Sequence, residues 1–264
     1  MLPPSYFDEI PLWSAPFGLK LLENITLRKN INILDVGCGS GFPMIEIAER
    51  FGDHARVFGI DPSEEAVNSV KEKIARLGLR NISPQIGAAE RLPFEDDFFH
   101  LLVSNNGLNN VQDQARAVEE CFRVCRRGAQ ILFTVNLPDT MREFYDIYEQ
   151  VLRETGLLFE IEKLHEHIFE KRKPIEFYTE LFTNAGFTFI SAATDVFTMR
   201  FIDSDALFEH HCIRGAFLPP WEKIISGEMR EEVFRALSAA LDAHAESEGE
   251  LRLTIPFACF EFVK

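Results

Sequence analysis

The segment ILDVGCGSGF, residues 33–42, constrains the fold more than any other part of the chain. Glycine loses more conformational entropy on folding than any other residue, so three glycines within five positions need a structural reason. A buried parallel strand is indicated just before them by INILDV. A helix is indicated just after them by FPMIEIAERFG, with Pro43 in its first turn and Ile47, Ala48 and Phe51 on its buried face. A strand, a glycine turn and a helix in this order direct backbone N–H groups at a ligand beyond the carboxyl end of a sheet.

The spacing of the glycines separates two classes of ligand. A dinucleotide-binding turn has the fingerprint G-x-G-x-x-G. Here Gly37, Gly39 and Gly41 give G-x-G-x-G, and Phe42 occupies the position of the third dinucleotide glycine. Together with Asp35 the pattern is D-x-G-x-G-x-G, which resembles motif I of the class I S-adenosylmethionine (SAM)-dependent methyltransferases. An NAD-dependent oxidoreductase is the alternative that this spacing disfavours.

Three later segments extend the resemblance. A second short strand, VFGID, ends at Asp61, twenty residues after Gly41. The stretch IGAAERLPFEDDFFHLLVSNNGLNNV is similar to the third and fourth motifs of the methyltransferase type 11 group, which includes the ubiquinone and menaquinone biosynthesis methyltransferases. The stretch AVEECFRVCRRGAQILFTV resembles the helix, turn and fifth strand that follow in that group. The resemblance covers residues 30–136 and implies a SAM-dependent methyltransferase.

Composition limits the range of partners and compartments. A chain of 264 residues that is 46% hydrophobic suits one large domain, or one domain with a cap, around a buried core. A net charge of −15 disfavours nucleic acid, because phosphate binding needs a basic face. No apolar run is long enough to span a membrane, and MLPPSYFDEI lacks the features of a signal peptide. We therefore expect a cytoplasmic protein, a monomer or a homodimer, that acts on a small-molecule acceptor.

The cysteines predict neither a metal site nor a disulfide framework. No C-x-x-C pair or zinc-type spacing is present, and a reduced compartment is the simplest interpretation. Cys121 and Cys125 are expected to share one face of a helix as small core residues. Some arsenic methyltransferases of this superfamily hold their substrate with thiols, an alternative that the spacing does not favour. The five cysteines are Cys38, Cys121, Cys125, Cys212 and Cys259.

Alternating strand and helix signals predict a parallel sheet built from βαβ units. The helix over residues 64–77 is expected to begin at a Ser63 cap and to end at Gly78. Pro84 within the third strand predicts that this strand lies at a sheet edge. The first five strands are expected at residues 31–36, 57–61, 82–86, 99–104 and 129–135.

The second half of the chain is expected to complete the sheet. A helical insertion follows the fifth strand, and a helix ending at Gly186 precedes a sixth strand, FTFISAATDVFTMRF. Residues 202–249 are expected to be mostly helical, broken by Pro219 and Pro220, before a last strand LRLTIPFACFEFV. The predicted fold class is α/β: a Rossmann-like, seven-stranded, mostly parallel sheet with an antiparallel last strand, helices on both faces, and helical cap or lid insertions. The expected division is an N-terminal segment covering the cofactor site, a SAM-binding core, and a sheet-completing part with the substrate cap, at residues 1–30, 31–136 and 137–264.

The resemblance assigns parts of the cofactor to individual residues. Asp61, at the end of the second strand, is expected to hold the ribose diol. Asp35 either orients the glycine loop through N–H contacts or reaches the methionine amine through water. The family's GDAE element, which meets the adenine, is GAAE here, so Ala88 replaces its aspartate, and a backbone group of Ala89 is expected to contact the base, with Glu90 as the alternative. The full predicted cofactor set is Asp35, Gly37, Cys38, Gly39, Gly41, Asp61, Pro62, Ala88, Ala89, Glu90, Asn105 and Trp13.

Several of these residues have specific expected contacts. Asn105 is expected to face the methionine part, whereas Asn106 and Asn109 are expected to cap the next helix. Pro62 and Leu92 are expected to give the adenine apolar contacts.

Methyl transfer asks the protein mainly to hold acceptor, methyl and sulfur in line. If the acceptor must be deprotonated, a base is needed, and the candidates are His210, His211 and Tyr6, with His165 and His167 as weaker ones. The segment DSDALFEHHCIRGAFLPPW, residues 203–221, is predicted to form part of a lid over the acceptor, the alternative being a helical pair that covers the sheet or forms a dimer interface. The predicted substrate-binding residues are Arg214, Phe217, Trp221 and Tyr145. A non-catalytic SAM-binding module is the remaining alternative for the whole chain.

Overall fold

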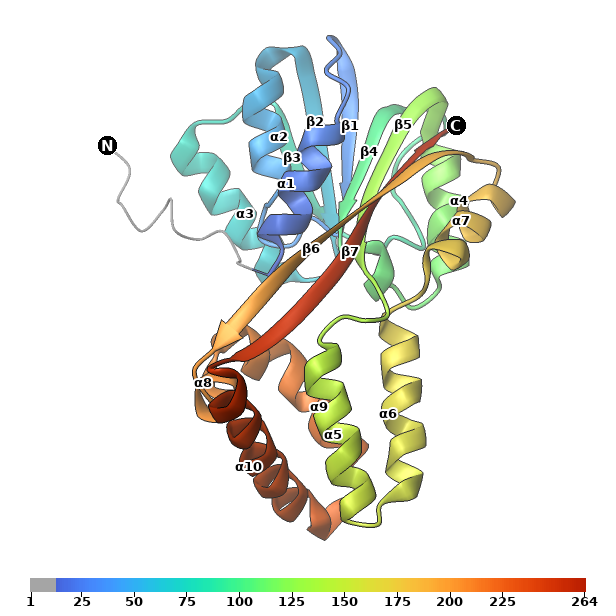
Figure 1. Ribbon diagram of the computed structural model, residues 1–264. Coiled ribbons are helices and arrows are strands. Elements are labelled where there is room, and N and C mark those ends of the chain that lie inside the picture. The colour runs from blue at the N-terminus through green and yellow to red at the C-terminus, as the bar shows by residue number, and fades with distance from the viewer. Residues whose placement is uncertain (1–12) are drawn as a thin grey trace. The chain divides into compact units, whose positions relative to one another are not determined.

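A seven-stranded mixed sheet organises the chain (Figure 1). The computed structural model describes residues 13–264, so Tyr6 lies outside the described residues. The strand order is β3-β2-β1-β4-β5-β7-β6. β1 to β5 pair in parallel and β7 runs antiparallel to β5, which confirms the predicted fold class. The strands are β1 Ile31–Val36, β2 Ala55–Asp61, β3 Ile82–Ile86, β4 Phe99–Asn105, β5 Cys125–Asn136, β6 Thr188–Phe201 and β7 Leu251–Val263.

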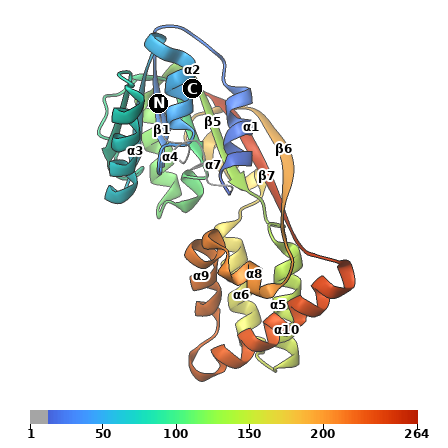
Figure 2. The ribbon, with the colours of Figure 1, turned by 90° about the vertical axis from the view of Figure 1, so that its left-hand side faces the viewer.

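Helices cover both faces of this sheet (Figures 1 and 2). On one face, apolar side chains of α1, α2 and α3 form a buried cluster with alternate residues of the central strands, such as Ile33, Val57 and Val103. On the other face, Phe133 of β5 stacks on Phe182 of α7 with ring centroids 4.4 Å apart. The helices are α1 Ala15–Asn24, α2 Met44–Phe51, α3 Glu64–Leu77, α4 Gln114–Val124, α5 Arg142–Glu154, α6 Leu158–Lys171, α7 Ile175–Asn184, α8 Ser204–Glu209, α9 Leu218–Ile224 and α10 Arg230–Glu248.

Local signals placed several elements correctly. Ser63 Oγ accepts the Ala66 N–H at 3.2 Å at the start of α3, and Gly78 ends that helix with φ 69°. Both are the ends that the sequence predicts. β3, which contains Pro84, lies at an edge of the sheet as expected.

Two local predictions were wrong. Cys125 does not share a helix with Cys121, because it ends α4 and begins β5, although both side chains are fully buried. Pro219 and Pro220 do not break a helix but lie in the first turn of α9. The backbone N–H groups of a first turn have no partner within the helix, so proline is tolerated there. A π-helical turn, Ile213–Phe217, leads directly into that helix.

The chain packs as two compact units, each discontinuous in sequence. The described part of the first, which we call the core unit, comprises residues 13–136, 174–194 and 257–264. The second, which we call the helical unit, comprises Leu137–Lys173 and Asp195–Pro256. The functional division into residues 1–30, 31–136 and 137–264 stays a prediction. None of the helices within residues 13–264 combines the length and the apolar character needed to cross a bilayer.

Candidate functional site

The glycine turn between β1 and α2 has a backbone that other residues rarely adopt. Gly37, Gly39 and Gly41 have φ values of 76°, 50° and 109°. An L side chain at these angles meets its own backbone, so all three positions favour glycine. The Gly37 and Cys38 N–H groups donate to the Ile60 carbonyl at 2.8 and 3.1 Å, which fixes the turn to the end of β2.

A second loop, after β4, approaches the glycine turn backbone to backbone. A Cβ on Gly37 would lie 2.8 Å from the Gly107 Cα, and a Cβ on Gly107 would lie 2.4 Å from the Val36 carbonyl oxygen. Ser104 Oγ reinforces this junction, because it donates to the same Val36 oxygen at 2.7 Å and accepts the Leu108 N–H at 3.1 Å. The requirement for glycine at position 107 arises from a neighbour 70 residues away, so sequence patterns did not reveal it.

Asp61 joins the glycine turn to the start of α3. Its Oδ2 accepts the Gly39 N–H and its Oδ1 accepts the Ser63 N–H, both at 2.9 Å. An ionised carboxylate has about four lone-pair sites, so each oxygen can accept one further hydrogen bond. Orientation of the glycine turn by a side chain, which was one of the two roles predicted for Asp35, is therefore performed by Asp61.

Asp35 is fully buried beside this junction. Neither of its carboxyl oxygens has a hydrogen-bond partner among the described residues, although the nearby Met44 N–H slightly favours the charged form. Burial, and to a lesser extent the negative charge of Asp61, raise the pKa of Asp35 to about 8. A buried carboxyl without a partner is suited to a cationic or hydrogen-donating group of a ligand.

A pocket of about 650 Å³ opens in the core unit at the carboxyl ends of β1, β2 and β4. Ligand pockets commonly have volumes of roughly 300–1,000 Å³. Of the predicted cofactor residues, Gly37, Asp61, Pro62, Ala88, Ala89 and Glu90 line it. Asp35, Cys38, Gly39, Gly41, Asn105 and Trp13 are not among its lining residues. The further lining residues are Val36, Ile60, Gly87, Asn106, Gly107, Asn110, Val111, Gln112 and Asp113.

Glu90 is engaged in holding one wall of this pocket. Its Oε1 accepts the Gln112 N–H at 3.0 Å and the Asp113 N–H at 3.3 Å. These bonds fix the loop before α4, so Glu90 is less suited to contact a base. The Ala89 N–H has no partner within residues 13–264, which leaves it available to a ligand.

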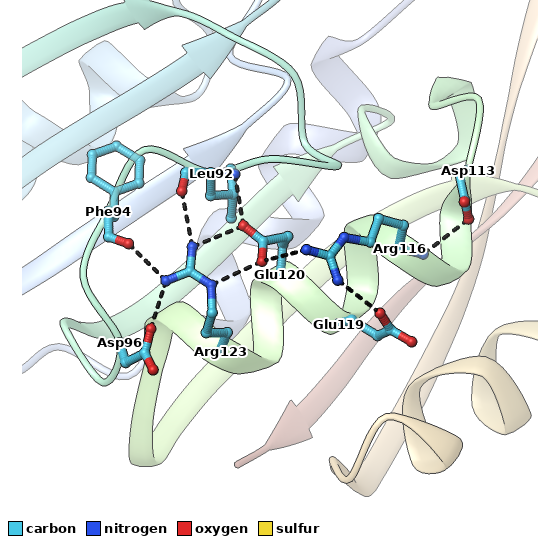
Figure 3. A network of polar contacts seen from close by, with 8 residues as sticks. All are labelled: Leu92, Phe94, Asp96, Asp113, Arg116, Glu119, Glu120 and Arg123. Atoms are coloured by element: carbon cyan, nitrogen blue, oxygen red, sulfur yellow. Dashed lines mark hydrogen bonds and ion pairs between the residues drawn. The ribbon is translucent and has the colours of Figure 1, made fainter.

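A charged network fixes the segment that follows the GAAE element (Figure 3). Arg123 of α4 donates from Nη2 to the Leu92 carbonyl at 2.9 Å and from Nη1 to the Phe94 carbonyl at 2.8 Å. The buried Glu120 accepts the Leu92 N–H at 2.9 Å. The hydrogen bond from Arg123 holds the pKa of Glu120 below its usual value. Leu92 is buried but is not among the residues lining the pocket.

Asn105 has a different set of contacts from the one expected. Its Nδ2 donates to the Ser14 carbonyl at 3.1 Å, and its Oδ1 accepts from Thr134 Oγ1 at 2.8 Å. It therefore fixes the start of α1 to the end of β4. A Cβ on Gly18 of α1 would lie 2.2 Å from the Phe42 ring, so α1 packs tightly against the end of the glycine turn. Trp13 packs beside α1, with its ring 5.6 Å from that of Phe17.

The prediction that Asn106 and Asn109 cap the next helix was wrong. Asp113 caps α4, and Asn109 Nδ2 donates instead to Asn136 Oδ1 at 3.1 Å. Asn106 lines the pocket with φ 56°, and its side-chain nitrogen and oxygen have no partner among the described residues. Asparagine tolerates this left-handed backbone better than most residues. The NNG triplet was therefore the sequence signal for the left-handed turn at Asn106 that the sequence analysis missed.

The predicted acceptor residues lie in the helical unit. Trp221 is fully buried and donates from Nε1 to the Tyr145 hydroxyl at 2.8 Å, and the Phe217 ring lies 5.8 Å from that of Trp221. Arg214 and His211 are exposed instead. Arg214 forms an ion pair with Glu209 at 3.0 Å, and the His211 ring lies 4.7 Å from that of His210.

The weaker base candidates have other partners. His165 forms a surface contact with Glu149 at 2.6 Å, and His167 lies 3.4 Å from the Tyr145 hydroxyl. Residues 13–264 contain no group of three or more histidine, cysteine and acidic side chains placed to hold a metal ion.

Comparisons with known proteins identify related sequences and related folds. The profile of a family described as methyltransferase domain matches residues 27–185. The chain is 30% identical over 178 residues to the demethylmenaquinone methyltransferase of Listeria welshimeri serovar 6b, covering 64% of this chain and 75% of that protein. BH2331 from Bacillus halodurans C-125 shares the fold, with a TM-score of 0.62 and 19% identity over 94% of this chain and 98% of that one. A SAM-dependent methyltransferase from Aquifex aeolicus gives a TM-score of 0.53 at 19% identity, covering 73% of this chain and 93% of that one.

Replacing Gly107 by alanine is expected to disturb the junction of the two loops. The new Cβ would meet the Val36 carbonyl oxygen and Ser104 Oγ, so the free energy of unfolding should fall by about 1–3 kcal/mol, as for other overpacked sites. Urea denaturation measures this change. Gly215→Ala is the matched control, because a Cβ there meets no atom within 4 Å and should leave stability unchanged or slightly raised. Equal stability of the two variants would contradict the close contact.

The raised pKa of Asp35 predicts a dependence of stability on pH. The folded protein holds this proton up to a pKa of about 8, whereas the unfolded chain releases it near 3.8. The folded state therefore binds more protons between these values, and this group makes stability fall as pH rises through that window. Asp35→Asn should melt at a higher temperature than the wild type at pH 8, and the difference should vanish near pH 4.

Melting curves across this range test the prediction, with the exposed Asp53→Asn as control. A difference between Asp35→Asn and the wild type that does not change with pH would refute it.

Proposed function

The chain belongs to the methyltransferase-domain family, and on that premise we propose that it transfers a methyl group from SAM to a small-molecule acceptor. One observation carries the assignment of the cofactor. Asp61 accepts one bond from the glycine turn and one from the start of α3, and it still lines the pocket of about 650 Å³, so its remaining acceptor positions are available to a ligand there. A ribose diol, which offers two adjacent hydroxyl donors, matches such a carboxylate.

The remaining residues of the site fit the other parts of SAM. The Ala89 N–H is available to donate to an adenine ring nitrogen, and Pro62 and Val111 provide apolar lining for the ring. Asp35 has two unpartnered oxygens suited to the methionine ammonium group, directly or through water. A nearby ammonium group would favour the ionised form of Asp35 and so lower its pKa. The attraction between the two charges would offset the cost of burying the carboxylate.

The catalytic contribution of the chain is positioning. Bound SAM supplies a methyl group on a sulfonium, which is already a good leaving group. Holding the acceptor in line with that methyl removes much of the orientational entropy of a bimolecular reaction. Side-chain hydrogen bonds to the backbone, such as those that Glu90 accepts from Gln112 and Asp113, keep one pocket wall in place for this purpose.

A quinone-like or phenolic acceptor is the class that the relatives support. The Listeria welshimeri relative is named for methylating demethylmenaquinone, and a net charge of −15 disfavours nucleic acid as the acceptor. We assign acceptor recognition to the segment at residues 203–221, with Phe217 and Trp221 as its apolar part and His211 and Arg214 as exposed polar groups. Tyr6 and His210 remain further candidates for a base.

An oxidoreductase that binds NAD is the second function considered. Phe42 fills the position of the third dinucleotide glycine, and its ring is wedged against Gly18 of α1. A pyrophosphate needs close approach to the helix at this point, so the packing favours SAM. The remaining alternative is a protein that binds SAM but does not catalyse methyl transfer. Only a measurement of methyl-transfer turnover distinguishes it from an enzyme.

Removing the Asp61 carboxylate is expected to weaken SAM binding. A hydrogen bond to a charged group contributes about 1.5–3 kcal/mol, which corresponds to roughly ten- to a hundredfold in the dissociation constant. Asp61→Asn should show this loss in titration calorimetry while staying folded, because its amide oxygen can still accept one backbone N–H. Glu72→Ala, an exposed carboxylate on α3, is the control and should bind SAM as the wild type does. Unchanged SAM affinity in folded Asp61→Asn would remove Asp61 from the cofactor site.

Substitutions in the segment at residues 203–221 test its assignment to the acceptor. His211→Ala and Arg214→Ala should lower methyl transfer to quinols or phenols at least severalfold and leave SAM affinity unchanged. Arg235→Ala is the control, since Arg235 also forms an exposed ion pair, with Glu231 of α10. If turnover stays intact in both variants and only melting temperature or oligomeric state changes, the segment has a structural role.

A further inference from the structure

The helical unit buries an arginine that the proposed methyl transfer does not use. Arg172 follows α6 directly and is 2% exposed. Its Nη2 donates to the Tyr145 hydroxyl at 2.8 Å, and the central guanidinium carbon lies 4.8 Å from the centroid of the Tyr145 ring. Its Nε and Nη1 have no hydrogen-bond partner among the described residues.

This arginine carries a charge without a counter-charge. A guanidinium stays protonated in proteins, so burial cannot be relieved by loss of the proton. None of the ion pairs within residues 13–264 includes Arg172. A buried charge is costly unless it is paired and hydrogen-bonded, so two donor nitrogens and a full positive charge are available to a ligand.

The side chains that contact Arg172 and its partner Tyr145 are aromatic and uncharged. The Tyr145 hydroxyl accepts from Trp221 Nε1 at 2.8 Å and lies 3.4 Å from His167 Nε2. Burial, and secondarily the charge of Arg172, lower the pKa of His167 to about 4, so this imidazole is neutral near pH 7. Trp221 in turn stacks on Phe144 with ring centroids 4.0 Å apart. Arg172 is therefore the single charge of the cluster formed by these residues.

We propose that the helical unit binds a small organic carboxylate at Arg172. The planar guanidinium matches a carboxylate, and one positive charge balances one monoanion, whereas a phosphate dianion would retain an uncompensated charge. The aromatic surroundings suit an apolar body attached to the carboxylate. His167 is the half-buried member of the cluster, so it is the side that lies nearest to solvent. The carboxylate belongs either to the methyl acceptor or to a separate acid that modulates the enzyme.

Binding of benzoate to the full chain tests the proposal without SAM, so its outcome does not depend on the proposed function. Calorimetry should show saturable binding in the millimolar range or tighter, with a rise in melting temperature, and benzamide should bind at least tenfold more weakly. Arg172→Met should lose benzoate binding at least tenfold. Arg153→Met, which removes an exposed arginine of α5, should bind benzoate as the wild type does.

Stability of the variants separates ligand binding from a structural role. Removal of an unpaired buried charge should leave the melting temperature of Arg172→Met unchanged or raised in the absence of ligand, whereas a structural arginine would lower it. Arg172→Lys keeps the charge but loses the planar group, so it should fold and bind benzoate more weakly than the wild type. No saturable benzoate binding by the wild type, or equal benzoate affinity in the wild type and either Arg172 variant, would overturn the proposal.

Kinetics then identify the source of the carboxylate. If the acceptor itself carries it, benzoate should compete with the acceptor in methyl transfer from SAM. If a separate acid binds there, benzoate should change the rate without competing with the acceptor.

Discussion

The two hydrogen bonds that the Asp61 carboxylate accepts are the interactions on which the site depends. One carboxylate accepts the Gly39 N–H of the turn after β1 and the Ser63 N–H at the start of α3. It therefore fixes two loops that emerge from neighbouring parallel strands, and it does so at the edge of the pocket. The close approach of Gly37 to Gly107 adds the loop after β4 to the same junction. A ligand that hydrogen-bonds to Asp61 binds a group whose position is already set by the backbone, so little ordering remains to be done on binding.

Sequence patterns predicted the parts of this arrangement that depend on local chemistry. The strand, glycine turn and helix follow from hydrophobic periodicity and backbone freedom, and α3 begins and ends at its predicted cap residues. Family resemblance pointed to Asp61, Pro62 and Ala89, all of which line the pocket. Its assignment of these residues to SAM stays a prediction.

Contacts between distant segments were not predictable in the same way. Asn105 contacts Ser14, 91 residues earlier in the chain, and Glu90 holds the backbone of Gln112. Nothing adjacent to either residue in the sequence indicates these partners. The error over Cys125 has a related cause, since a spacing of four residues fits a helix but strand pairing with Phe99 starts β5 at that residue. The spacing of apolar residues reflects only the preference of the segment itself. In the folded protein, pairing with a neighbouring strand decides whether that segment is helix or strand.

Two buried ionisable groups with unpartnered polar atoms, Asp35 in the core unit and Arg172 in the helical unit, share one physical interpretation. A ligand that supplies the missing counter-charge would offset the cost of burying each charge. Their opposite signs match opposite ligand charges, an ammonium for Asp35 and a carboxylate for Arg172.

The most direct measurement of the central claim is a parallel calorimetric titration of the wild-type protein with SAM and with NAD. We predict saturable binding of SAM and no saturable binding of NAD up to millimolar concentration, on the order of the weakest affinities that such titrations resolve. Tight NAD binding, or the absence of any SAM binding by the folded protein, would contradict the assignment of the glycine turn and Asp61 to a methyl donor.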